Sequence, residues 1–248
     1  MSGPLSNPFM FNAAGDADFY THQIASSIRL EGATPNYLGI TPGSAGNNQI
    51  FTFSIWLKRT KIDGAVQAIL DATDGSGEDG IFFNTSNQLE TYSDAGNGTI
   101  KTNAIFRDIS AWMHIVWRYD STQAVDTNRE RIYVNGELQT LASSTYASQN
   151  ATSSLINDSC EHDMGRAEHL DRYPFHGYFA EVVMIDGTSL APTSFGTSKN
   201  GVWIPDDVSG LTFGTNGFYL NMATTTFGND VSGNNNDWAS NGFAATDH

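Results

Sequence analysis

Hydrophobic and polar residues alternate strictly in several short runs of the chain. The run FTFSIWLKR (residues 51–59) places Phe, Phe, Ile and Leu on one face and Thr, Ser, Trp and Lys on the other. The run WMHIVWRYD (residues 112–120) places Met113, Ile115, Trp117 and Tyr119 on one face. A period of two is that of a β-strand, in which successive side chains point to opposite faces. Both runs are therefore predicted to be strands.

Turn signals separate these runs. RIYVNGELQT (residues 131–140) alternates, reaches Asn135-Gly136 and resumes at Glu137. An Asn-Gly pair between alternating runs predicts a hairpin, because both central residues of a type I′ turn need positive φ. Asn-Gly and Asp-Gly pairs recur from Asp63 to Gly242, and no long run has helical spacing between capping residues. The pattern predicts an all-β fold, a two-sheet antiparallel jelly-roll sandwich.

The alternating strands occupy only the middle of the chain, so three zones are predicted. Residues 25–197 form the jelly-roll domain, residues 1–24 an N-terminal anchoring arm, and residues 198–248 a C-terminal arm rich in Gly and Asn. Both extended arms carry aromatic residues, which a solvated linker would lack. We expect them to lie on an apolar surface: their own domain, a neighbouring copy or a larger assembly. The equal alternative is that the C-terminal arm adds edge strands to the same sandwich. The aromatic candidates for partner contact are Phe9, Phe11, Phe19, Tyr20, Trp203 and Trp238.

Charge narrows the classes of partner. The 248 residues include 27 acidic and 12 basic side chains, a formal net charge of −15. An acidic surface repels phosphate backbones and anionic lipid heads, so neither nucleic acid nor membrane is an expected partner. One cysteine, Cys160, excludes an internal disulfide framework. The first residues lack a basic region followed by an apolar run, so no signal peptide is predicted. The expected site of action is inside a cell, or outside it after release by a route such as lysis.

Several runs of the chain also carry a family resemblance. IFTFSIWLKRT, QAILDATDGSGEDGIFFNTSNQLETY, AWMHIVWRYDST, RERIYVNGEL and DMGR…YPFHGYFAEVVMIDGTSL follow one another over about residues 26–195. Their order resembles the laminin-G/pentraxin-type jelly roll of the concanavalin A-like lectin/glucanase superfamily. The resemblance implies a concanavalin A-like fold and, as its common use, carbohydrate recognition.

The two ends of the chain carry a second resemblance, to segments that flank this domain in one class of proteins. The start NPFMFNAAG and the tail from NGVWIPDDVSG onward are similar to segments that accompany such domains in virion proteins of tailed, especially marine, bacteriophages. The resemblance implies a protein made in the host cytoplasm and placed on the particle surface. There it would contact major capsid or tail proteins, and we expect a homo-oligomer. The expected role is capsid decoration or cement, or a head-fibre component. The alternative is a tail-fibre or tail-tip protein that binds a host surface glycan.

A glycoside hydrolase is the remote alternative, as a polysaccharide depolymerase. Enzymes of the superfamily resemble one another in an E-x-D-x-x-E strand that brings two carboxylates to about 5 Å. The nearest match is Glu161-His162-Asp163-Met164-Gly165-Arg166, in which the last acid is an arginine. A guanidinium can serve neither as nucleophile nor as general acid at neutral pH. The sequence therefore predicts no catalytic residues and a protein that is not an enzyme, with Met164 a core residue.

Possible metal ligands occur in two forms. His162, His169 and His176 lie near Cys160, but H-E-x-x-H and C-x-x-C spacings are absent. We interpret the histidines as solvated or paired with neighbouring acids, with His162 and His169 as candidate partner contacts. No cofactor is expected, although calcium is left open because related domains bind it through acidic loops. The weak calcium candidates are Asp71, Asp74, Asp79, Asp230 and Asp237, which are more commonly turn residues.

A sugar site would need an aromatic platform with planar polar groups. Tyr92, Trp112, Tyr146 and Tyr173 are candidates by residue type alone. Trp56 and Trp117 lie in alternating strands and are assigned to the core. The sequence does not choose among the four candidates, so a glycan remains one of several expected partners.

Overall fold

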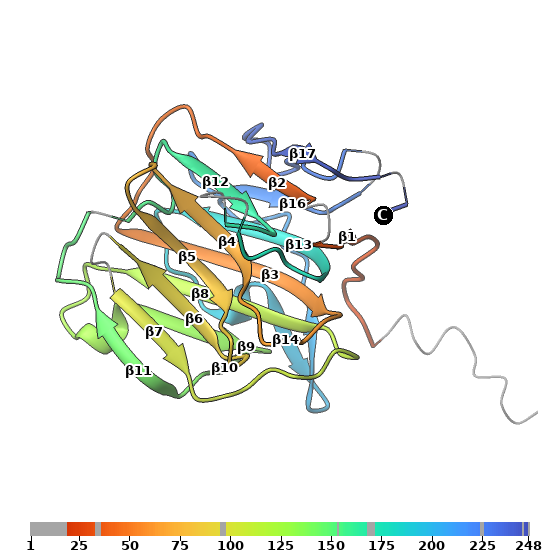
Figure 1. The fold of residues 1–248 in the computed structure, drawn as a ribbon, viewed down its shortest axis with the longest axis horizontal. Coiled ribbons are helices and arrows are strands. Elements are labelled where there is room, and N and C mark those ends of the chain that lie inside the picture. The colour runs from red at the N-terminus through yellow and green to blue at the C-terminus, as the bar shows by residue number, and fades with distance from the viewer. Residues whose placement is uncertain are drawn as a thin grey trace, which may run out of the picture.

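The computed structural model describes residues 19–32, 36–94, 98–152, 154–167, 172–223, 226–244 and 246–247. These residues form antiparallel β-strands in two packed layers, which Figure 1 shows with β4 and β5 in front and β3 and β8 behind. They contain no α-helix, only the short 3₁₀ helices η1 (Asp126–Asn128) and η2 (Pro192–Ser194). No helix in this part of the chain could span a membrane. The predicted all-β antiparallel sandwich is confirmed.

The rear layer in Figure 1 is a seven-stranded sheet centred on β13 and β3. One edge of β13 pairs with β3, and its other edge pairs with β1 and then with β16. Its strands are β1 (Ile28–Leu30), β16 (Phe218–Leu220), β13 (Gly177–Asp186), β3 (Ile50–Arg59), β8 (Met113–Asp120), β9 (Glu130–Val134) and β10 (Glu137–Leu138).

The front layer is an eight-stranded sheet, and a separate hairpin lies outside both layers. In spatial order its strands are β11 (Leu141–Tyr146), β7 (Gly98–Thr102), β6 (Leu89–Ser93), β5 (Glu78–Phe83), β4 (Gln67–Thr73), β12 (Glu161–Met164), β2 (Tyr37–Ile40) and β17 (Ala239–Asn241). The hairpin consists of β14 (Gly196–Lys199) and β15 (Val202–Pro205).

The turn between β9 and β10 has the geometry predicted from its sequence. Asn135 and Gly136 both have positive φ, 49° and 81°. These are the left-handed conformations that a type I′ turn requires, and they match the right-handed twist of the flanking strands. The Asn-Gly pair thus sets the register in which Val134 pairs with Glu137.

The main core lies between the two sheets. Phe51, Phe53 and Ile55 of β3 and Ile115 and Trp117 of β8 all point into it. These are the faces that the alternation predicted, including the core position of Trp117. Each fully buried side chain of this size contributes roughly 1.5–3 kcal/mol relative to exposure.

The opposite face of β3 is also buried, at Thr52, Ser54 and Trp56. A second hydrophobic cluster covers it, built from the outward side chains of the seven-stranded sheet and from the segment that follows β13. Its members are Val116, Tyr133, Val183, Ile185, Phe195, Val208, Phe213 and Tyr219. Thr52 fastens this cover, since its hydroxyl donates to Thr188 O and accepts from Leu190 N, both at 2.8 Å.

The C-terminal segment lies on its own domain. β16 extends the seven-stranded sheet and β17 extends the eight-stranded sheet, so the segment adds edge strands to both. Trp238 is only 4 % exposed and packs edge-to-face on Phe218 at 5.1 Å. The prediction of Trp238 as a partner contact was therefore wrong: its ring fills this chain's own core.

A β-bulge in β13 connects the N-terminal segment to the sheet. The ladder with β3 shifts between Ala180 and Val183, and Glu181 takes φ = 41°. Bulges re-aim side chains, and here the Glu181 carboxylate accepts the Tyr219 hydroxyl at 2.9 Å. The same oxygen lies 2.5 Å from Nε2 of His22. The bulge thus holds the chain near residue 22 against the outer face of the seven-stranded sheet.

Candidate functional site

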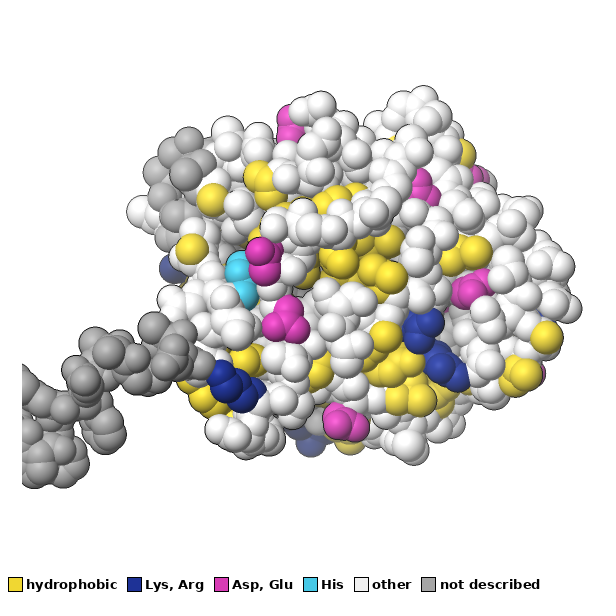
Figure 2. Space-filling model, turned by 180° about the vertical axis from the view of Figure 1, so that it is seen from behind, with side chains coloured by type: hydrophobic (Ala, Val, Ile, Leu, Met, Phe, Trp, Pro, Cys, Tyr) yellow, Lys and Arg dark blue, Asp and Glu magenta, His cyan; other side chains and the backbone are white. Residues whose placement is uncertain are grey.

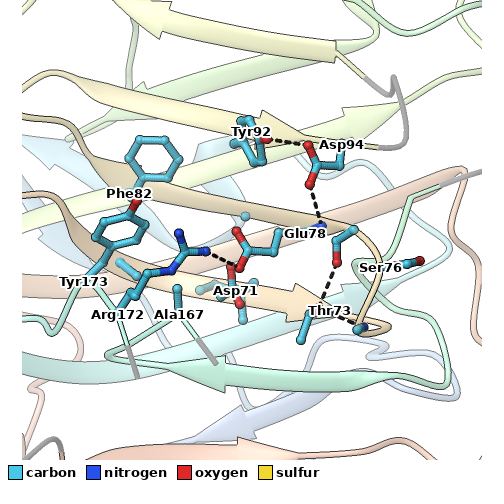
Figure 3. A pocket seen from close by; sticks show the side chains of 15 residues that line it. Asp71, Thr73, Ser76, Glu78, Phe82, Tyr92, Asp94, Ala167, Arg172 and Tyr173 are labelled. Atoms are coloured by element: carbon cyan, nitrogen blue, oxygen red, sulfur yellow. Dashed lines mark hydrogen bonds and ion pairs between the residues drawn. The ribbon is translucent and has the colours of Figure 1, made fainter. Parts of the chain in front are cut away.

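A groove of about 490 Å³ crosses the outer face of the eight-stranded sheet. It runs over β4, β5 and β6, and the end of the β12–β13 connection forms one wall (Figure 3). The polar and aromatic side chains that line it are Asp71, Thr73, Ser76, Glu78, Phe82, Tyr92, Asp94, Arg172 and Tyr173. In contrast to the seven-stranded sheet, no second hydrophobic cluster of the described residues covers this face.

Strand alternation and register place these side chains. In β5, Ile81 and Phe83 point into the core, so Gly80 and Phe82 face outward. Gly80 pairs with Asp71 on one side and with Tyr92 on the other. Asp71, Gly80 and Tyr92 therefore form one row across three strands.

Gly80 keeps the centre of that row open. A Cβ at this position would lie 2.6 Å from Leu70 O and 3.4 Å from Asp71 Oδ1. The first distance is closer than real Cβ atoms approach, so a side chain here would force the strands apart. The absence of a side chain leaves the space between Asp71 and Tyr92 unfilled.

Tyr92 and Asp94 form one end of the groove. The Tyr92 hydroxyl donates to Asp94 Oδ1, and Asp94 Oδ2 accepts the Glu78 backbone N–H at 3.3 Å. The hydrogen bond to Asp94 raises the pKa of Tyr92 to about 12, with burial adding to it. The phenol therefore stays protonated at physiological pH, and its hydrogen bond fixes the orientation of a ring that is 39 % exposed.

Arg172 and Tyr173 form the other side. Arg172 Nη2 donates to Glu78 Oε1 at 2.8 Å, and its guanidinium lies 5.1 Å from the centre of the Tyr173 ring. Figure 3 shows Tyr173 beside Phe82 at one end, with Arg172 and Glu78 between this pair and Tyr92. The three carboxylates of the lining outnumber its one guanidinium, so the groove is acidic.

The turn between β4 and β5 forms a rigid rim. Asp74 Oδ1 accepts the Ser76 hydroxyl and backbone N–H, both at 2.8 Å, and the Gly77 N–H at 2.9 Å. These hydrogen bonds, that of the Ser76 hydroxyl first, lower the pKa of Asp74. Thr73 closes the turn by donating to Gly77 O at 2.8 Å. The Asp74 carboxylate therefore accepts hydrogen bonds within its own turn.

The calcium candidates do not converge. Asp71 faces the groove, whereas Asp79 is buried on the inner side of the sheet, where its Oδ2 accepts the Leu155 N–H at 2.8 Å. Asp230 accepts backbone N–H groups from Tyr219, Ser232 and Asn236, and Asp237 accepts that of Asp230. Within the described residues no three His, Cys, Asp or Glu side chains are grouped to hold a metal. Asp230 and Asp237 organise a turn.

The histidine-rich stretch is mainly structural where it is described. His162 is buried, its Nε2 accepts the Asn157 N–H at 3.0 Å, and its Nδ1 donates to Cys160 O at 2.9 Å. Burial lowers the pKa of His162 to about 4. Its prediction as an exposed partner contact was wrong, because β12 carries it inward. His169, Phe9 and Phe11 lie outside the described residues. Burial raises the pKa of the Cys160 thiol to about 12, which makes it a poor nucleophile.

The strand compared with hydrolases carries an internal ion pair. Met164 is fully buried, as predicted, and Asp163 faces the opposite side of β12. Arg166 Nε donates to Asp163 Oδ2 at 2.6 Å, and its guanidinium lies 3.3 Å from the centre of the Tyr37 ring. The position of the third acid is therefore occupied by a cation that neutralises one of the other two.

The structure brings two of the four sugar-site candidates together. Tyr92 and Tyr173 line the groove, whereas Trp112 lies beside β15 on the other sheet and Tyr146 lies on the edge strand β11. Sequence reasoning missed the polar partners Glu78, Asp94 and Arg172. The alternation within GIFF and LETYS is a signal that could have shown Phe82 and Tyr92 as outward residues of their strands, but only the pairing of β4, β5 and β6 aligns them.

The remaining aromatic candidates lie at the outer face of the seven-stranded sheet. Trp203 is half-buried and its indole N–H donates to His114 Nδ1 at 3.0 Å. Phe19 is half-buried and Tyr20 is exposed, with their rings edge-to-face at 4.9 Å. Trp56 is buried, as predicted.

Comparison with known proteins identifies this architecture. Residues 32–192 match the family model of the concanavalin A-like lectin/glucanases superfamily. No curated protein sequence matches the chain. Among solved structures, a putative carbohydrate-binding protein from Bacteroides ovatus is similar with a TM-score of 0.56 and 16 % identity, covering 88 % of this chain and 59 % of that one.

Two further structures are more remote. The heptameric SAP-like pentraxin of Limulus polyphemus has a TM-score of 0.48 and 10 % identity, covering 69 % of this chain and 80 % of the pentraxin. Domains LG4-5 of the mouse laminin α1 chain have a TM-score of 0.49 and 10 % identity, covering 66 % of this chain and 43 % of that one.

Proposed function

Because this chain belongs to the concanavalin A-like lectin/glucanases superfamily, we propose that it binds carbohydrate, without catalysis, in the groove across β4, β5 and β6. The observation that carries the proposal is that two exposed aromatic rings, Tyr92 and Tyr173, line opposite ends of one groove whose lining also holds hydrogen-bonded carboxylates. The structural similarity to a putative carbohydrate-binding protein of Bacteroides ovatus is consistent with it.

The lining has the groups that sugar recognition needs. Aromatic rings offer apolar faces on which the C–H face of a sugar packs, and Tyr92 is held in place by its bond to Asp94. Carboxylates and a guanidinium give planar hydrogen-bonding groups that fix the orientation of ring hydroxyls. Since Glu78, Phe82 and Tyr92 stand on paired strands and Arg172 is held by its hydrogen bond to Glu78, ligand binding orders few groups, which keeps its entropic cost low.

The charge of the groove favours glycans without acidic groups. Asp71, Glu78 and Asp94 line it, and the guanidinium of Arg172 is already bonded to Glu78. A sugar carboxylate would meet like charges, which costs binding free energy. Neutral hydroxyls, in contrast, can donate to the carboxylate oxygens. We therefore propose neutral hexose-type glycans as the ligand class.

The ion pair of β12 supports a binding role over hydrolysis. Retaining hydrolysis needs two free carboxyl groups about 5 Å apart, whereas Asp163 is bonded to Arg166 at 2.6 Å. A depolymerase would release reducing ends from polysaccharide. We expect no such release from the purified protein.

For the biological setting we propose the surface of a tailed-phage particle. The support is the resemblance of the chain ends to phage virion proteins and the net charge of −15, which disfavours nucleic-acid and membrane partners. The role is capsid decoration, cement or head-fibre component, and alternatively a tail fibre or tail tip that attaches to a host glycan. A homo-oligomer in contact with capsid or tail proteins fits either location. Labelled electron microscopy of purified virions tests the setting, and absence of the protein from the particles would contradict it.

A glycan array probed with the full-length protein tests the binding proposal. We expect retention of neutral oligosaccharides and weak or no retention of sialylated and uronate-containing ones. A protein that binds none of the arrayed neutral glycans above background would contradict the proposal. Isothermal titration calorimetry with the strongest neutral ligand then gives its Kd.

A further inference from the structure

A second groove lies on the opposite side of the molecule and has a different chemistry. Its volume is about 780 Å³, and it lies between residues 20–27 and strand β15, over the outer face of the seven-stranded sheet. Three tryptophans line it, Trp56, Trp112 and Trp203, together with Tyr20 and Val202. Figure 2 shows this side of the molecule, where hydrophobic side chains reach the surface between polar ones.

The floor of this groove is a rigid stack of rings. Trp56 stacks on His114 with ring centres 4.8 Å apart, and His114 stacks on Trp203 at 6.0 Å. Because Trp203 donates to His114 Nδ1, the proton of the neutral imidazole is on Nε2, which donates to Ser54 Oγ at 2.8 Å. Burial keeps the imidazole neutral by lowering the pKa of His114 to about 3. The imidazole and the Trp203 indole therefore use their polar atoms inside the stack, and ring faces remain for a ligand.

Apolar surface is exposed at the rim. Trp112 is 39 % exposed, Tyr20 42 % and Val202 49 %. Exposed apolar side chains that gather around one hollow mark an interaction site, whereas scattered ones need no explanation. Gln23, Ser26 and Ser27 also line the groove, so it offers ring faces to apolar side chains and polar groups to a peptide backbone, which suits an apolar peptide.

The chain's own N-terminal residues join the described structure at this groove. Lys199 Nζ donates to Phe19 O at 2.9 Å, and His22 is held by Glu181. The first described residues, Phe19 and Tyr20, are thus held beside the groove, and they are preceded in the sequence by residues 1–18. Their sequence includes GPLSNPFMF at residues 3–11, which has two prolines and two phenylalanines and no charged side chain.

We propose that the tryptophan-lined groove binds residues 3–11 of its own chain. Aromatic grooves bind proline-containing segments because these lose little conformational entropy on docking. About eight residues separate Phe11 from Tyr20 and can span up to roughly 28 Å, enough to fold back over the groove. The short tether gives an effective concentration on the order of millimolar, which favours the chain's own segment over a second copy. This proposal is independent of the glycan-binding proposal.

Acrylamide quenching of tryptophan fluorescence in the full-length protein tests the proposal. Trp56, Trp117 and Trp238 are buried, so changes in quenching report on Trp112 and Trp203. The variant Phe9→Ser/Phe11→Ser should raise the quenching constant roughly twofold by uncovering these indoles. Ser6→Ala, in the same segment, is the matched control and should match the wild type. In a Trp112→Ala background the serine pair should have a smaller effect.

Three results would overturn the proposal. The first is equal quenching of the wild type and of the Phe9→Ser/Phe11→Ser variant. The second is protection that is lost on dilution of about a hundredfold, since a tethered segment is insensitive to protein concentration and a second copy is not. The third is protection of Trp112 by a neutral glycan, which would make this groove a sugar site. Circular dichroism of each variant checks that it remains folded.

Discussion

The two sheets of this protein use their outer faces in opposite ways. The seven-stranded sheet is covered by the segment after β13, so β3 and β8 are buried on both sides and a second hydrophobic cluster forms. Among the described residues, the eight-stranded sheet has no such cover over the outer face of β5 and β6, where Glu78 and Phe82 are half-buried and Tyr92 is exposed, whereas Asp71 in the same row on β4 is buried. The covered face contributes stability, and the open face presents polar chemistry.

The comparison shows how one fold separates the two tasks. Most side chains on the open face are free of the packing constraints that a covered face imposes, so they can be polar or acidic. Gly80 is an exception, because a Cβ there would lie 2.6 Å from Leu70 O. Substitutions on the covered face should therefore change the free energy of unfolding. Substitutions in the open groove should change ligand binding and leave unfolding nearly untouched.

The largest expected effect is on the covered face, at Phe195. Its side chain is fully buried in the second cluster, so Phe195→Ala should lower the free energy of unfolding by about 3–5 kcal/mol. Phe82→Ala, on the open face, should cost less than about 1 kcal/mol. Urea unfolding followed by fluorescence measures both. Similar losses of unfolding free energy in the two variants would contradict the proposed difference between the covered and the open face.

Acid should lower the free energy of unfolding through His114 on the covered face. Burial lowers the pKa of His114 to about 3 in the folded protein, against about 6.5 when unfolded. The unfolded state therefore binds the proton first, and stability is lost as pH falls below 6.5, by about 2 kcal/mol from this group at pH 5. His162, with a pKa of about 4, adds a loss of the same sign.

Thermal unfolding between pH 7 and pH 4.5 measures this loss. His114→Gln should show a shallower dependence on pH than the wild type, since the variant has no group to titrate at this position. A variant that is destabilised yet keeps the full pH dependence would show that His114 is not its source.

On the open face, we expect the substitution Glu78→Gln to raise the affinity for an acidic glycan. This carboxylate holds Arg172 Nη2 at 2.8 Å, so Glu78→Gln removes one negative charge and loosens the guanidinium for a ligand carboxylate. Calorimetry with a uronate-containing oligosaccharide should show affinity raised by about tenfold, or 1.4 kcal/mol. Glu90→Gln is the control, because Glu90 lies on β6 and is not among the groove-lining residues. An equal gain in both variants would point to net charge alone.

The smallest expected effect is that of calcium. Asp74, Asp230 and Asp237 use their oxygens for backbone N–H groups of their own turns. We therefore expect the Tm with added calcium to match the Tm with EDTA within about 1 °C, well below the shift that 1 kcal/mol would cause. A clear rise with calcium would show that these carboxylates hold a cation.

Local pattern was enough to predict much of the fold. The alternation in β3 and β8 identified the core face, and Asn135-Gly136 identified the hairpin, because both signals depend on neighbouring residues alone. The covering of the opposite face was not predictable from that alternation. Thr52 and Ser54 lie on the polar face of the alternation, and only the later segment with Phe195 and Phe213 shows why they are buried.

The candidate site could be predicted only in part, for the same reason. Tyr92 and Tyr173 were identified by residue type, but 80 residues separate them in the chain, and strand register decides which residues share a groove. His162 was misread because several histidines close together suggest a solvated segment, and Trp238 because an aromatic residue in a Gly- and Asn-rich arm suggests contact with a partner. His162 is instead satisfied by the backbone at Asn157 and Cys160. The pairing of strands that are distant in the sequence decides which residues are buried and which share a groove, and a single sequence does not show that pairing.

The most direct measurement is the affinity of Tyr92→Ala for a neutral oligosaccharide that the wild-type protein binds. Calorimetry should show a loss of about tenfold or more, because the ring that packs on the sugar is removed. Tyr146→Ala, on the edge strand of the same sheet but outside the groove, should bind as the wild type does. Unchanged affinity in Tyr92→Ala, or an equal loss in Tyr146→Ala, would contradict glycan binding in this groove.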